Sequence, residues 1–406
     1  MTNKVYLENS YLTKIKAIVK DKKIIDNTIH LITNRTIFYP HMSGGQPKDE
    51  GLINNVQVLN VYKKDDNIIH ILSEDIFDEE VSLTIDWNTR FDHMQQHTGQ
   101  HILSAAFNKL FDANTIGFHL GKDYVYIDID ISDITKEQIQ KVETFANQII
   151  FSNFDIKTYY VNKEQLANLP IKKVPKINNE NIRIVAIDDI DYSPCAGTHN
   201  STTGEVGLIK IRKWEKYKGN IRLEFVCGNR ALTDFRWKND YINSLANFFS
   251  TKDDNILNTA TKMYEENKLL KKQIKKLNND LLSFQCNELL SKGKNYDGIN
   301  LISNIYQDTQ FSKIRDIASY ITNSPSTLVI LGVTSKNKCQ IILAKSQNLP
   351  NINIKKVFNQ IIPLLKGSGG GNPYMVQGGG QDCQYLSNCI DNGLTLIKEQ
   401  IEKSTG

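Results

Sequence analysis

The sequence predicts an α+β protein built from several domains, and three observations lead to this class. Short strand-like segments fill the first 90 residues, strands and helices mix between residues 91 and 240, and a long heptad pattern follows. A chain of 406 residues allows two to four domains at roughly 100–200 residues per domain. We predict four parts: a small N-terminal β-barrel over 1–90, an α+β core over 91–240, a long coiled-coil-like helix over 241–292 and a C-terminal α/β domain over 293–406.

The N-terminal part is predicted to be a barrel or meander because short strands follow one another closely. Turn-forming residues, such as those at 65–67, separate the strands. The predicted strands are Thr13–Ile18, His30–Thr33, Gln57–Tyr62, Ile68–Ile71 and Val81–Ile85.

A loop rich in glycine and proline, Phe38–Pro47, interrupts these strands. The adjacent Gly44 and Gly45 free its backbone, and two prolines frame the stretch. Taken alone, this composition is typical of a surface turn.

The predicted core combines helices with strands, which is an α+β pattern. Apolar residues recur at helical spacing in His93–Phe111, and a second helix is expected near Lys136–Phe151. The predicted strands are Tyr124–Ile129, Arg183–Ile187 and Ile221–Val226.

A heptad seam over about four repeats predicts a long helix that pairs with another helix. The partner helix would come from the same chain or from a second copy in a homodimer. A long helix docked on its own domain is an equally good interpretation. The seam consists of Ile256, Ala260, Met263, Asn267, Leu270, Ile274, Leu277, Leu281 and Phe284.

The C-terminal part is predicted to be a separate α/β domain. Two strands are expected at Leu328–Thr334 and Cys339–Ala344, a helix at Ile354–Leu365 and a last helix from about Cys383 to Glu402. Glycine runs at 367–371 and 378–380 lie between the helices, where they are consistent with flexible turns or with a close approach to a phosphate backbone.

Composition narrows the class of protein. No apolar run reaches the ~18 residues of a membrane helix, and the N-terminus lacks the apolar stretch of a secretion signal. We therefore expect a cytoplasmic protein with no membrane partner. The net charge of +4 does not by itself indicate a nucleic-acid partner.

The six cysteines include no CxxC pair. A cysteine with a functional role is therefore better interpreted as a metal ligand or a nucleophile than as half of a disulfide.

Two pairs of residues have the spacing of metal ligands. His97 and His101 lie four apart in a predicted helix, so both imidazoles share one face. Cys195 and His199 are also four apart, with a glycine between them that permits a tight turn. One thiolate and three imidazoles match a tetrahedral zinc site. The two pairs together are therefore much stronger evidence for a metal site than either pair alone.

The spacing leaves the role of such a zinc open. A zinc protease is disfavoured, because Thr98 stands where the HExxH motif needs glutamate. A closed set of four protein ligands is usually structural, and a buried cysteine with hydrogen-bonded histidines is a further interpretation. Catalysis would require an exchangeable ligand, or a metal that orients the substrate.

Taken together, the motifs of the chain resemble those of a known family. The HTGQH and CAGTH motifs at 97–101 and 195–199 resemble the paired zinc motifs of the alanyl-tRNA synthetase editing domain and of the free-standing alanyl-tRNA editing (AlaX) proteins; threonyl-tRNA synthetase is a more distant relative. The FYP and GGQP motifs in the loop, GEVG at 204–207 and GNRAL at 228–232 are also similar. The C-terminal part resembles the DHH-associated domain, and no class II synthetase core is recognisable, so the combination resembles the long form of AlaX. One departure is His41-Met42-Ser43 before the glycine pair.

The resemblance implies a zinc-dependent hydrolase that removes serine or glycine from mischarged tRNA(Ala). It implies that His97, His101, Cys195 and His199 bind zinc. Gly44 and Gly45 would bring the backbone close to the substrate, and Gln46 would orient water or the ester carbonyl. Thr36 matches a family position at which a hydroxyl contacts the serine side chain; a strand residue without a ligand is the alternative.

A basic stretch at 210–222 is the best local candidate for RNA contact, because cations neutralise phosphates and aromatic rings stack on unpaired bases. A solvated, charged strand face is the alternative interpretation. The expected tRNA-binding residues are Lys210, Arg212, Lys213, Trp214, Arg222, Gly369 and Gly370.

Three other functions are compatible with the residues: a zinc hydrolase of a free small-molecule ester, a non-catalytic tRNA-binding protein with a structural zinc, and a phosphoesterase. The last ranks lowest, because the chain lacks an aspartate-rich DHH motif.

Overall fold

The computed structural model describes residues 1–41, 44–122, 124–171, 181–335 and 338–405. The chain forms two compact units, Met1–Asp253 and Asp254–Gly406. In the described residues, no helix combines the length and the apolar character needed to cross a membrane.

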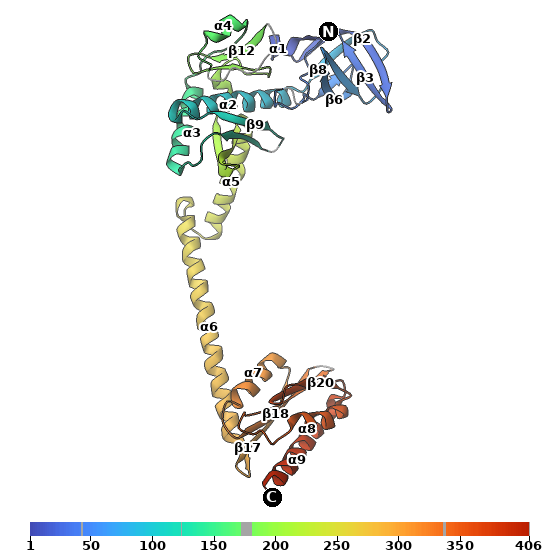
Figure 1. Ribbon diagram of the computed structural model, residues 1–406, viewed down its shortest axis with the longest axis vertical. Helices are drawn as coiled ribbons and strands as arrows, with labels where there is room; N and C mark the ends of the chain where they lie inside the picture. The colour runs from blue at the N-terminus through green and yellow to red at the C-terminus, as the bar shows by residue number, and fades with distance from the viewer. Residues whose placement is uncertain (42–43, 123, 172–180, 336–337, 406) are drawn as a thin grey trace. The chain divides into compact units, whose positions relative to one another are not determined.

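Six strands near the N-terminus close into a barrel in the order β2-β3-β7-β6-β5-β8 (Figure 1). Alternate side chains point inward, so residues such as Leu31, Val61 and Leu83 fill a continuous apolar core. A short two-stranded sheet, β1 (Asn3–Lys4) with β4 (Arg35–Thr36), lies beside α1 (Val5–Glu8). The barrel strands are β2 (Lys14–Ile25), β3 (Thr28–Thr33), β5 (Gly51–Ile53), β6 (Val56–Lys64), β7 (Asn67–Leu72) and β8 (Glu80–Ile85).

Helix α2 (Trp87–Phe111) follows the barrel and organises the rest of the first unit. Asp86 caps its first turn by accepting a hydrogen bond from the backbone N–H of Thr89 at 2.7 Å. Together with α3 (Lys136–Phe151), the helix packs on the apolar face of a four-stranded sheet. The strands of this sheet, in spatial order, are β14 (Ile209–Tyr217), β15 (Asn220–Cys227), β10 (Val125–Ile129) and β9 (Thr115–Leu120).

A second, three-stranded sheet leads into the Cys/His motif. Its strands are β11 (Ile156–Val161), β12 (Ile182–Ile187) and β13 (Asp191–Pro194), in that order, and β13 ends one residue before Cys195. The elements that complete this unit are α4 (Lys163–Ala167), η1 (Thr203–Val206) and α5 (Gly228–Phe248).

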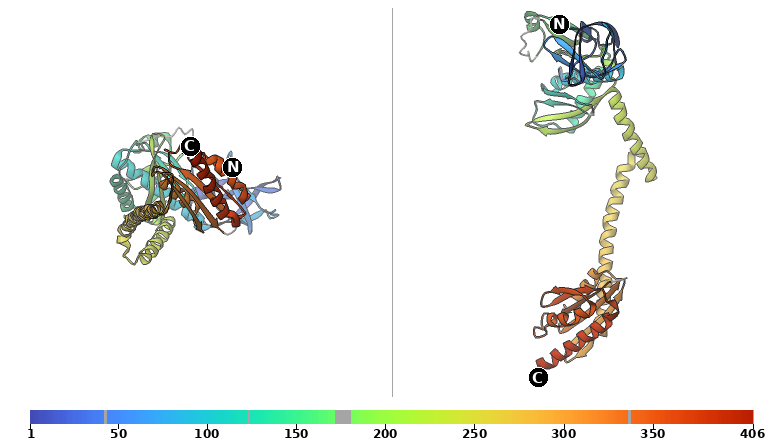
Figure 2. Two further views of the ribbon diagram at one scale, coloured as in Figure 1. Left: turned by 90° about the horizontal axis from the view of Figure 1, so that it is seen from below. Right: turned by 90° about the vertical axis from the view of Figure 1, so that its right-hand side faces the viewer.

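The second unit begins with the 37-residue helix α6 (Ile256–Lys292) and contains a six-stranded sheet of order β16-β17-β18-β19-β21-β20. The C-terminal end of α6 and α7 cover one face of this sheet, and α8 and α9 cover the other (Figure 1, Figure 2). The elements are β16 (Lys294–Tyr296), β17 (Ile299–Gln307), α7 (Phe311–Ile321), β18 (Thr327–Ser335), β19 (Lys338–Lys345), α8 (Ile354–Ile361), β20 (Ser368–Gly371), β21 (Met375–Gly380) and α9 (Leu386–Thr405).

The α+β class and the long helix are confirmed, while some details differ from the prediction. The helical stretch at 241–292 consists of the end of α5 and all of α6, because residues 249–255 separate two helices. The glycine runs are strands rather than turns: Gly369 faces Gly378 across β20 and β21. A Cβ on Gly378 would overlap the Phe358 ring and the neighbouring strand, which explains why glycine fits there.

Most of the predicted heptad seam is exposed on α6. Leu270, Leu277 and Phe284 expose 54%, 66% and 72% of their surface, whereas Ile256 is buried. Within the described part of the second unit, these side chains therefore have no covering helix. The four-part domain division and the dimer remain predictions.

Candidate metal centre and adjoining pockets

Helix α2 presents His97 and His101 on one face, as their spacing predicts. Both imidazoles are almost fully buried, and their ring centroids lie 5.4 Å apart. Gly99, between them, faces away, and a Cβ at this position would overlap the sulfur of Cys227. The helix can therefore carry the histidine pair only where it packs tightly against the end of β15.

The turn after β13 brings Cys195 and His199 to the same place. Arg183 on β12 holds this turn, because its Nη1 donates hydrogen bonds to the carbonyl oxygens of Cys195 at 2.8 Å and Gly197 at 3.0 Å. A Cβ on Gly197 would overlap the imidazole of His97. Glycine is therefore required here because the turn passes directly over a histidine ring.

The four side chains converge on one point. Their candidate ligand atoms all lie within 4.8 Å of one another. The sulfur of Cys195 lies 3.5 Å from Nε2 of His97 and 3.2 Å from Nε2 of His199. In a tetrahedral site with Zn–S near ~2.3 Å and Zn–N near ~2.0–2.1 Å, the corresponding S···N edge is about 3.5 Å. The observed separations are thus close to those of a zinc site.

Each of the three histidines is oriented by an oxygen atom on its outer side. Nδ1 of His97 lies 3.0 Å from Oε1 of Gln46, and Nδ1 of His101 lies 3.0 Å from Oδ2 of Asp191. Both oxygens only accept hydrogen bonds, so Nδ1 carries a proton in both rings and Nε2 is left to face the cluster.

Thr98 takes the corresponding position for the third ring. Its hydroxyl lies 3.3 Å from Nδ1 of His199 and accepts the backbone N–H of Asn200 at 3.2 Å. Outer hydrogen bonds of this kind fix the tautomer and ring direction of metal-binding histidines. A metal centre requires this arrangement at all three rings. A chance cluster of buried histidines does not require it.

The charges in the cluster favour a thiolate. Burial alone would raise the pKa of Cys195, but His97 and His199 outweigh it and hold that pKa well below its ordinary value. Burial lowers the pKa of His199 to about 3, so this imidazole is neutral near pH 7. Burial also acts to lower the pKa of His101, but Asp191 and the Cys195 thiolate outweigh it and raise that pKa to about 10, so zinc would displace a proton from this ring on binding. Thiolate and neutral imidazole are the forms that bind zinc, so the donor set fits that metal.

Gln46 is fully buried, and neighbouring groups use its amide. Its Nε2 donates to the hydroxyl of Thr198 at 2.8 Å, and its Oε1 accepts the Thr198 backbone N–H at 3.1 Å as well as the His97 proton. Gln46 therefore connects the glycine loop of the barrel with both metal-binding motifs. These contacts support a positioning role, and direct contact of Gln46 with water or the ester carbonyl stays a prediction.

The same loop is anchored to α2 by a buried ion pair. Asp49 and Arg90 expose none of their side-chain surface, and Nε of Arg90 donates to Oδ1 of Asp49 at 3.0 Å. Oδ2 of Asp49 also accepts the backbone N–H of Tyr39 at 2.5 Å. Gly44 and Gly45 in this loop have φ of +71° and +81°, a conformation that favours glycine. Met42 and Ser43, part of the departure from the family motif, lie outside the described residues.

Thr36 is buried inside the barrel and has its own partners. Its hydroxyl lies 2.8 Å from Nε2 of His70 and accepts the backbone N–H of Phe38 at 3.1 Å. Nδ1 of His70 donates to the carbonyl of Leu31, so Nε2 accepts and the Thr36 hydroxyl donates. Among the described residues, Thr36 is not part of the lining of either pocket beside Cys195.

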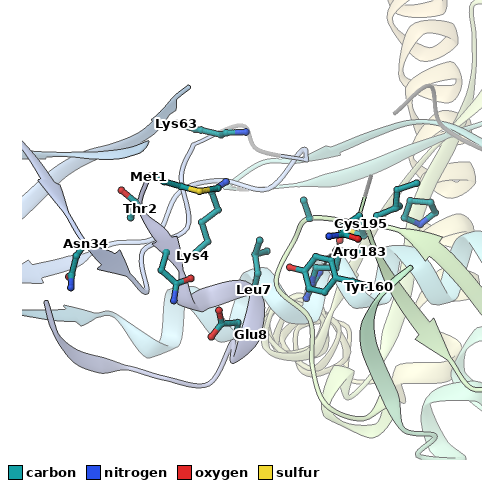
Figure 3. Close-up of a pocket in the computed structure, with 15 residues that line it drawn as sticks. Met1, Thr2, Lys4, Leu7, Glu8, Asn34, Lys63, Tyr160, Arg183 and Cys195 are labelled. Atoms are coloured by element: carbon teal, nitrogen blue, oxygen red, sulfur yellow. Dashed lines mark hydrogen bonds between the residues drawn. The ribbon is translucent and has the colours of Figure 1, made fainter. Parts of the chain in front are cut away.

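Two pockets meet at Cys195. The first, here called the metal-side pocket, has a volume of about 340 Å³ and is lined by Gly44, His97, Gln100, His101, Phe118, Ser193, Pro194 and Cys195. The second, here called the basic pocket, has a volume of about 740 Å³ and includes Lys4, Lys63 and Arg183 in its lining (Figure 3). Pro194 and Cys195 line both pockets. The candidate metal centre therefore borders open space, unlike a sealed structural site.

The predicted RNA-binding residues are largely engaged by neighbours. Lys210 forms an ion pair with Glu143, Arg212 with Glu224 and Asp234, and Lys213 with Glu224. Trp214 packs against the apolar core, which limits its use as a stacking platform.

Arg222 lies between two tyrosines, 4.0 Å from the ring centre of Tyr126 and 3.7 Å from that of Tyr217, and it pairs with Asp128 at 2.7 Å. Gly369 and Gly370 lie on the exposed strand β20 of the second unit. Sequence reasoning missed Asp191 and Arg183 as members of the site. Asp191 lies on the strand that leads into the Cys/His motif, whereas Arg183 is 12 residues before Cys195 and gave no local signal.

Similarity to known proteins agrees with this geometry. Residues 182–224, which contain the Cys/His motif, match the family described as the threonyl and alanyl tRNA synthetase second additional domain. The alanyl-tRNA editing protein AlaX-L of Pyrococcus horikoshii is 30% identical over 390 residues, covering 93% of this chain and 94% of the relative. This chain belongs to the alanyl-tRNA editing protein family.

Two further relatives are a second editing protein and an alanine–tRNA ligase. The alanyl-tRNA editing protein Aarsd1 of Mus musculus is 28% identical over 88% of this chain and 86% of its own length. The alanine–tRNA ligase of Methanobrevibacter smithii is 28% identical over 90% of this chain, but the match spans only 42% of the ligase. The editing family thus corresponds to a part of the synthetase.

Proposed function

We propose that this protein hydrolyses the ester bond of mischarged Ser-tRNA(Ala) and Gly-tRNA(Ala), with a zinc ion held by His97, His101, Cys195 and His199. The observation that carries the proposal is the convergence of these four side chains at the wall of an open pocket. Membership of a family whose relatives are named alanyl-tRNA editing proteins supports the choice of substrate.

The metal-side pocket is the proposed place for the aminoacyl group. Its volume of about 340 Å³ falls at the lower end of the ~300–1,000 Å³ found for ligand pockets, which suits one small amino acid and part of its nucleoside. Zinc bound there supplies Lewis-acid chemistry, which can hold the α-amino group of the substrate or lower the pKa of a water. Gly44 lines the pocket without a side chain, so the substrate can approach the loop backbone closely.

The protein's own residues keep the site in its working form. Gln46, Asp191 and Thr98 hold the three imidazoles with Nε2 inward, and Arg183 holds the turn that carries Cys195. This preorganisation favours catalysis, because the polar groups need not rearrange during the reaction.

Recognition of serine by Thr36 remains part of the proposal. A hydroxyl has one proton and two lone pairs, and here the proton and one lone pair are used by His70 and Phe38. One lone pair is left, but the side chain is fully buried and, among the described residues, lines neither pocket, so a contact with the serine hydroxyl would require the barrel wall beside Thr36 to open. Glycine has no such hydroxyl, so Thr36→Val should lower kcat/KM for Ser-tRNA(Ala) more than for Gly-tRNA(Ala).

The proposal is tested by the rate at which the purified protein deacylates Ser-tRNA(Ala), Gly-tRNA(Ala) and correctly charged Ala-tRNA(Ala). We expect faster loss of the two mischarged species, suppression by a chelator and recovery after zinc is added back. Hydrolysis of free seryl esters at the same rate would favour a small-molecule hydrolase. Binding of tRNA without any deacylation would favour a non-catalytic protein with a structural zinc.

A further inference from the structure

The basic pocket lies directly next to the metal-side pocket. It is formed between the N-terminal segment of the barrel and strands β11 and β12, and it reaches Cys195 at one end. Figure 3 shows Arg183, Tyr160 and Cys195 at one end, with Asn34 and Thr2 toward the other. A ligand that fills the basic pocket would therefore have one end at the candidate metal centre.

Arg183 is a buried cation in the wall of this pocket. Its residue surface is 8% exposed, and within the described residues its guanidinium forms no ion pair with a carboxylate and its Nε has no hydrogen-bond partner. A buried cation without a carboxylate partner is costly, and an anionic ligand would offset that cost. Nη1 is used by the Cys195 turn and Nε is buried, which leaves Nη2 as the donor for an anion.

Two lysines add to the positive charge. Lys4 and Lys63 both line the pocket, and Glu8 is the one carboxylate among its described lining residues. Burial and the nearby charge of Lys63 lower the pKa of Lys4, with only partial compensation from Asp66. The pocket therefore carries an excess of positive charge that an anionic ligand would relieve.

An aromatic ring stands beside Arg183. Tyr160 on β11 is the direct cross-strand partner of Arg183 on β12, and 55% of its surface is exposed. An exposed ring next to several cations is the combination that binds single-stranded nucleic acids, because bases stack on the ring while cations contact phosphates.

We propose that the basic pocket binds the unpaired nucleotides that precede the aminoacylated terminal nucleotide of the tRNA. Arg183, Lys4 and Lys63 contact their phosphates, and Tyr160 stacks on a base. This inference rests on the proposed function, since the strand would run through the basic pocket and place its aminoacyl end in the metal-side pocket. The volume of about 740 Å³ and the walls shared at Pro194 and Cys195 favour an extended strand over a single small anion.

The first experiment measures kcat/KM for Ser-tRNA(Ala) across a range of salt concentrations in the double variant Lys4→Ala/Lys63→Ala. The matched control is Lys64→Ala, because this neighbour points to the opposite side of β6 from Lys63 and does not line the pocket. For two lost phosphate contacts, we expect the slope of log(kcat/KM) against log salt to become shallower by about 1.4, at ~0.7 per contact for single strands.

A substrate without phosphates separates strand binding from chemistry. The double variant should hydrolyse 3′-O-seryl-adenosine as fast as the wild type and should retain its zinc. An unchanged salt slope, or an equal loss of rate with seryl-adenosine, would overturn the inference.

A binding measurement keeps the inference testable if the enzyme activity is absent. Fluorescence anisotropy measures the affinity for a 5′-fluorescein-labelled RNA hexanucleotide that ends in CCA. The wild type and Lys64→Ala should bind this RNA equally well. Tyr160→Ala and the double lysine variant should bind it more weakly. If wild type fails to deacylate Ser-tRNA(Ala) but binds the RNA in this pattern, the proposed function fails and the strand site stands. If inorganic phosphate displaces the RNA as effectively as unlabelled RNA does, the pocket is a site for small anions and the inference is wrong.

Discussion

Nδ1 of His97 donates a hydrogen bond to Oε1 of Gln46 across 3.0 Å, and so the glycine loop of the barrel sets the direction of a metal-binding ring on α2. The two residues are 51 positions apart in the chain. Gln46 also forms hydrogen bonds with the hydroxyl and the backbone N–H of Thr198. One amide therefore connects the barrel with both halves of the candidate metal centre.

Gln46→Ala should therefore weaken metal binding. Loss of an outer partner of a metal-binding histidine typically lowers metal affinity about 10–100-fold. Competition with a chromophoric chelator measures the zinc affinity, and Gln57→Ala, at an exposed position of β6, is the matched control. An unchanged zinc affinity combined with slow deacylation would instead mean that Gln46 contacts the substrate, as the sequence analysis expects.

Asp191→Ala should have a similar effect through His101. The carboxylate fixes the Nδ1 proton of this ring at 3.0 Å, so its removal frees the ring to rotate or to change tautomer. We expect the zinc affinity to fall by about tenfold or more, whereas the exposed neighbour Asp189→Ala should bind zinc like the wild type. Equal affinities in the two variants would show that Asp191 does not position His101.

Gly197→Ala should damage the site by steric overlap. The added methyl group would occupy the space of the His97 ring, and it would come within 3.2 Å of Oε1 of Gln46. Zinc content per chain, measured after dialysis, should drop well below that of the wild type. Gly370→Ala is the control, because a Cβ there meets open space, and its zinc content should not change. Full zinc loading of Gly197→Ala would contradict the geometry of the turn.

The burial of His70 in the barrel should make the stability of the protein depend on pH. Burial lowers its pKa to about 4, although the hydrogen bond to Leu31 acts in the opposite direction. The unfolded chain, with a pKa near ~6.5, then binds more protons than the folded protein between pH 4 and 6.5. Stability from this group is complete above about pH 6.5 and falls as the pH decreases toward 4, by about 2 kcal/mol between pH 7.5 and 5.

Urea unfolding of the metal-free protein at these two pH values measures this loss. The metal-binding histidines also titrate, so the informative quantity is the difference between wild type and His70→Gln, which lacks the titrating ring. The variant should lose about 2 kcal/mol less than the wild type over the same pH interval. Identical losses in both proteins would show that His70 does not contribute.

The clustering of the four candidate ligands was predictable because their spacing is local within each pair. His97 and His101 share a helix face by the geometry of one turn, and Cys195 and His199 flank a single tight turn. The helix expected near Lys136–Phe151 is present, and the structure shows that a capping box at Thr135 and Gln138 begins it.

The partners of these ligands were not predictable from one sequence. Asp191 and Arg183 become meaningful only when β12 and β13 pair and bring both to the Cys/His turn. The burial of Gln46 and its contacts with Thr198 depend on the folded loop, so the sequence could not reveal them, and its contact with the substrate stays a prediction. The glycine runs were consistent with flexible turns or with a close approach to phosphate, because glycine alone does not reveal the close strand contact between β20 and β21.

The central claim is that four side chains from α2 and the turn after β13 hold one metal ion through three nitrogens and one sulfur. Cobalt substitution tests it most directly, because a tetrahedral cobalt site with a thiolate ligand has strong visible bands and a thiolate-to-cobalt charge-transfer band. We predict one cobalt per chain with both features, and loss of the charge-transfer band in Cys195→Ser. A weak octahedral spectrum, or a charge-transfer band that survives in Cys195→Ser, would contradict the account.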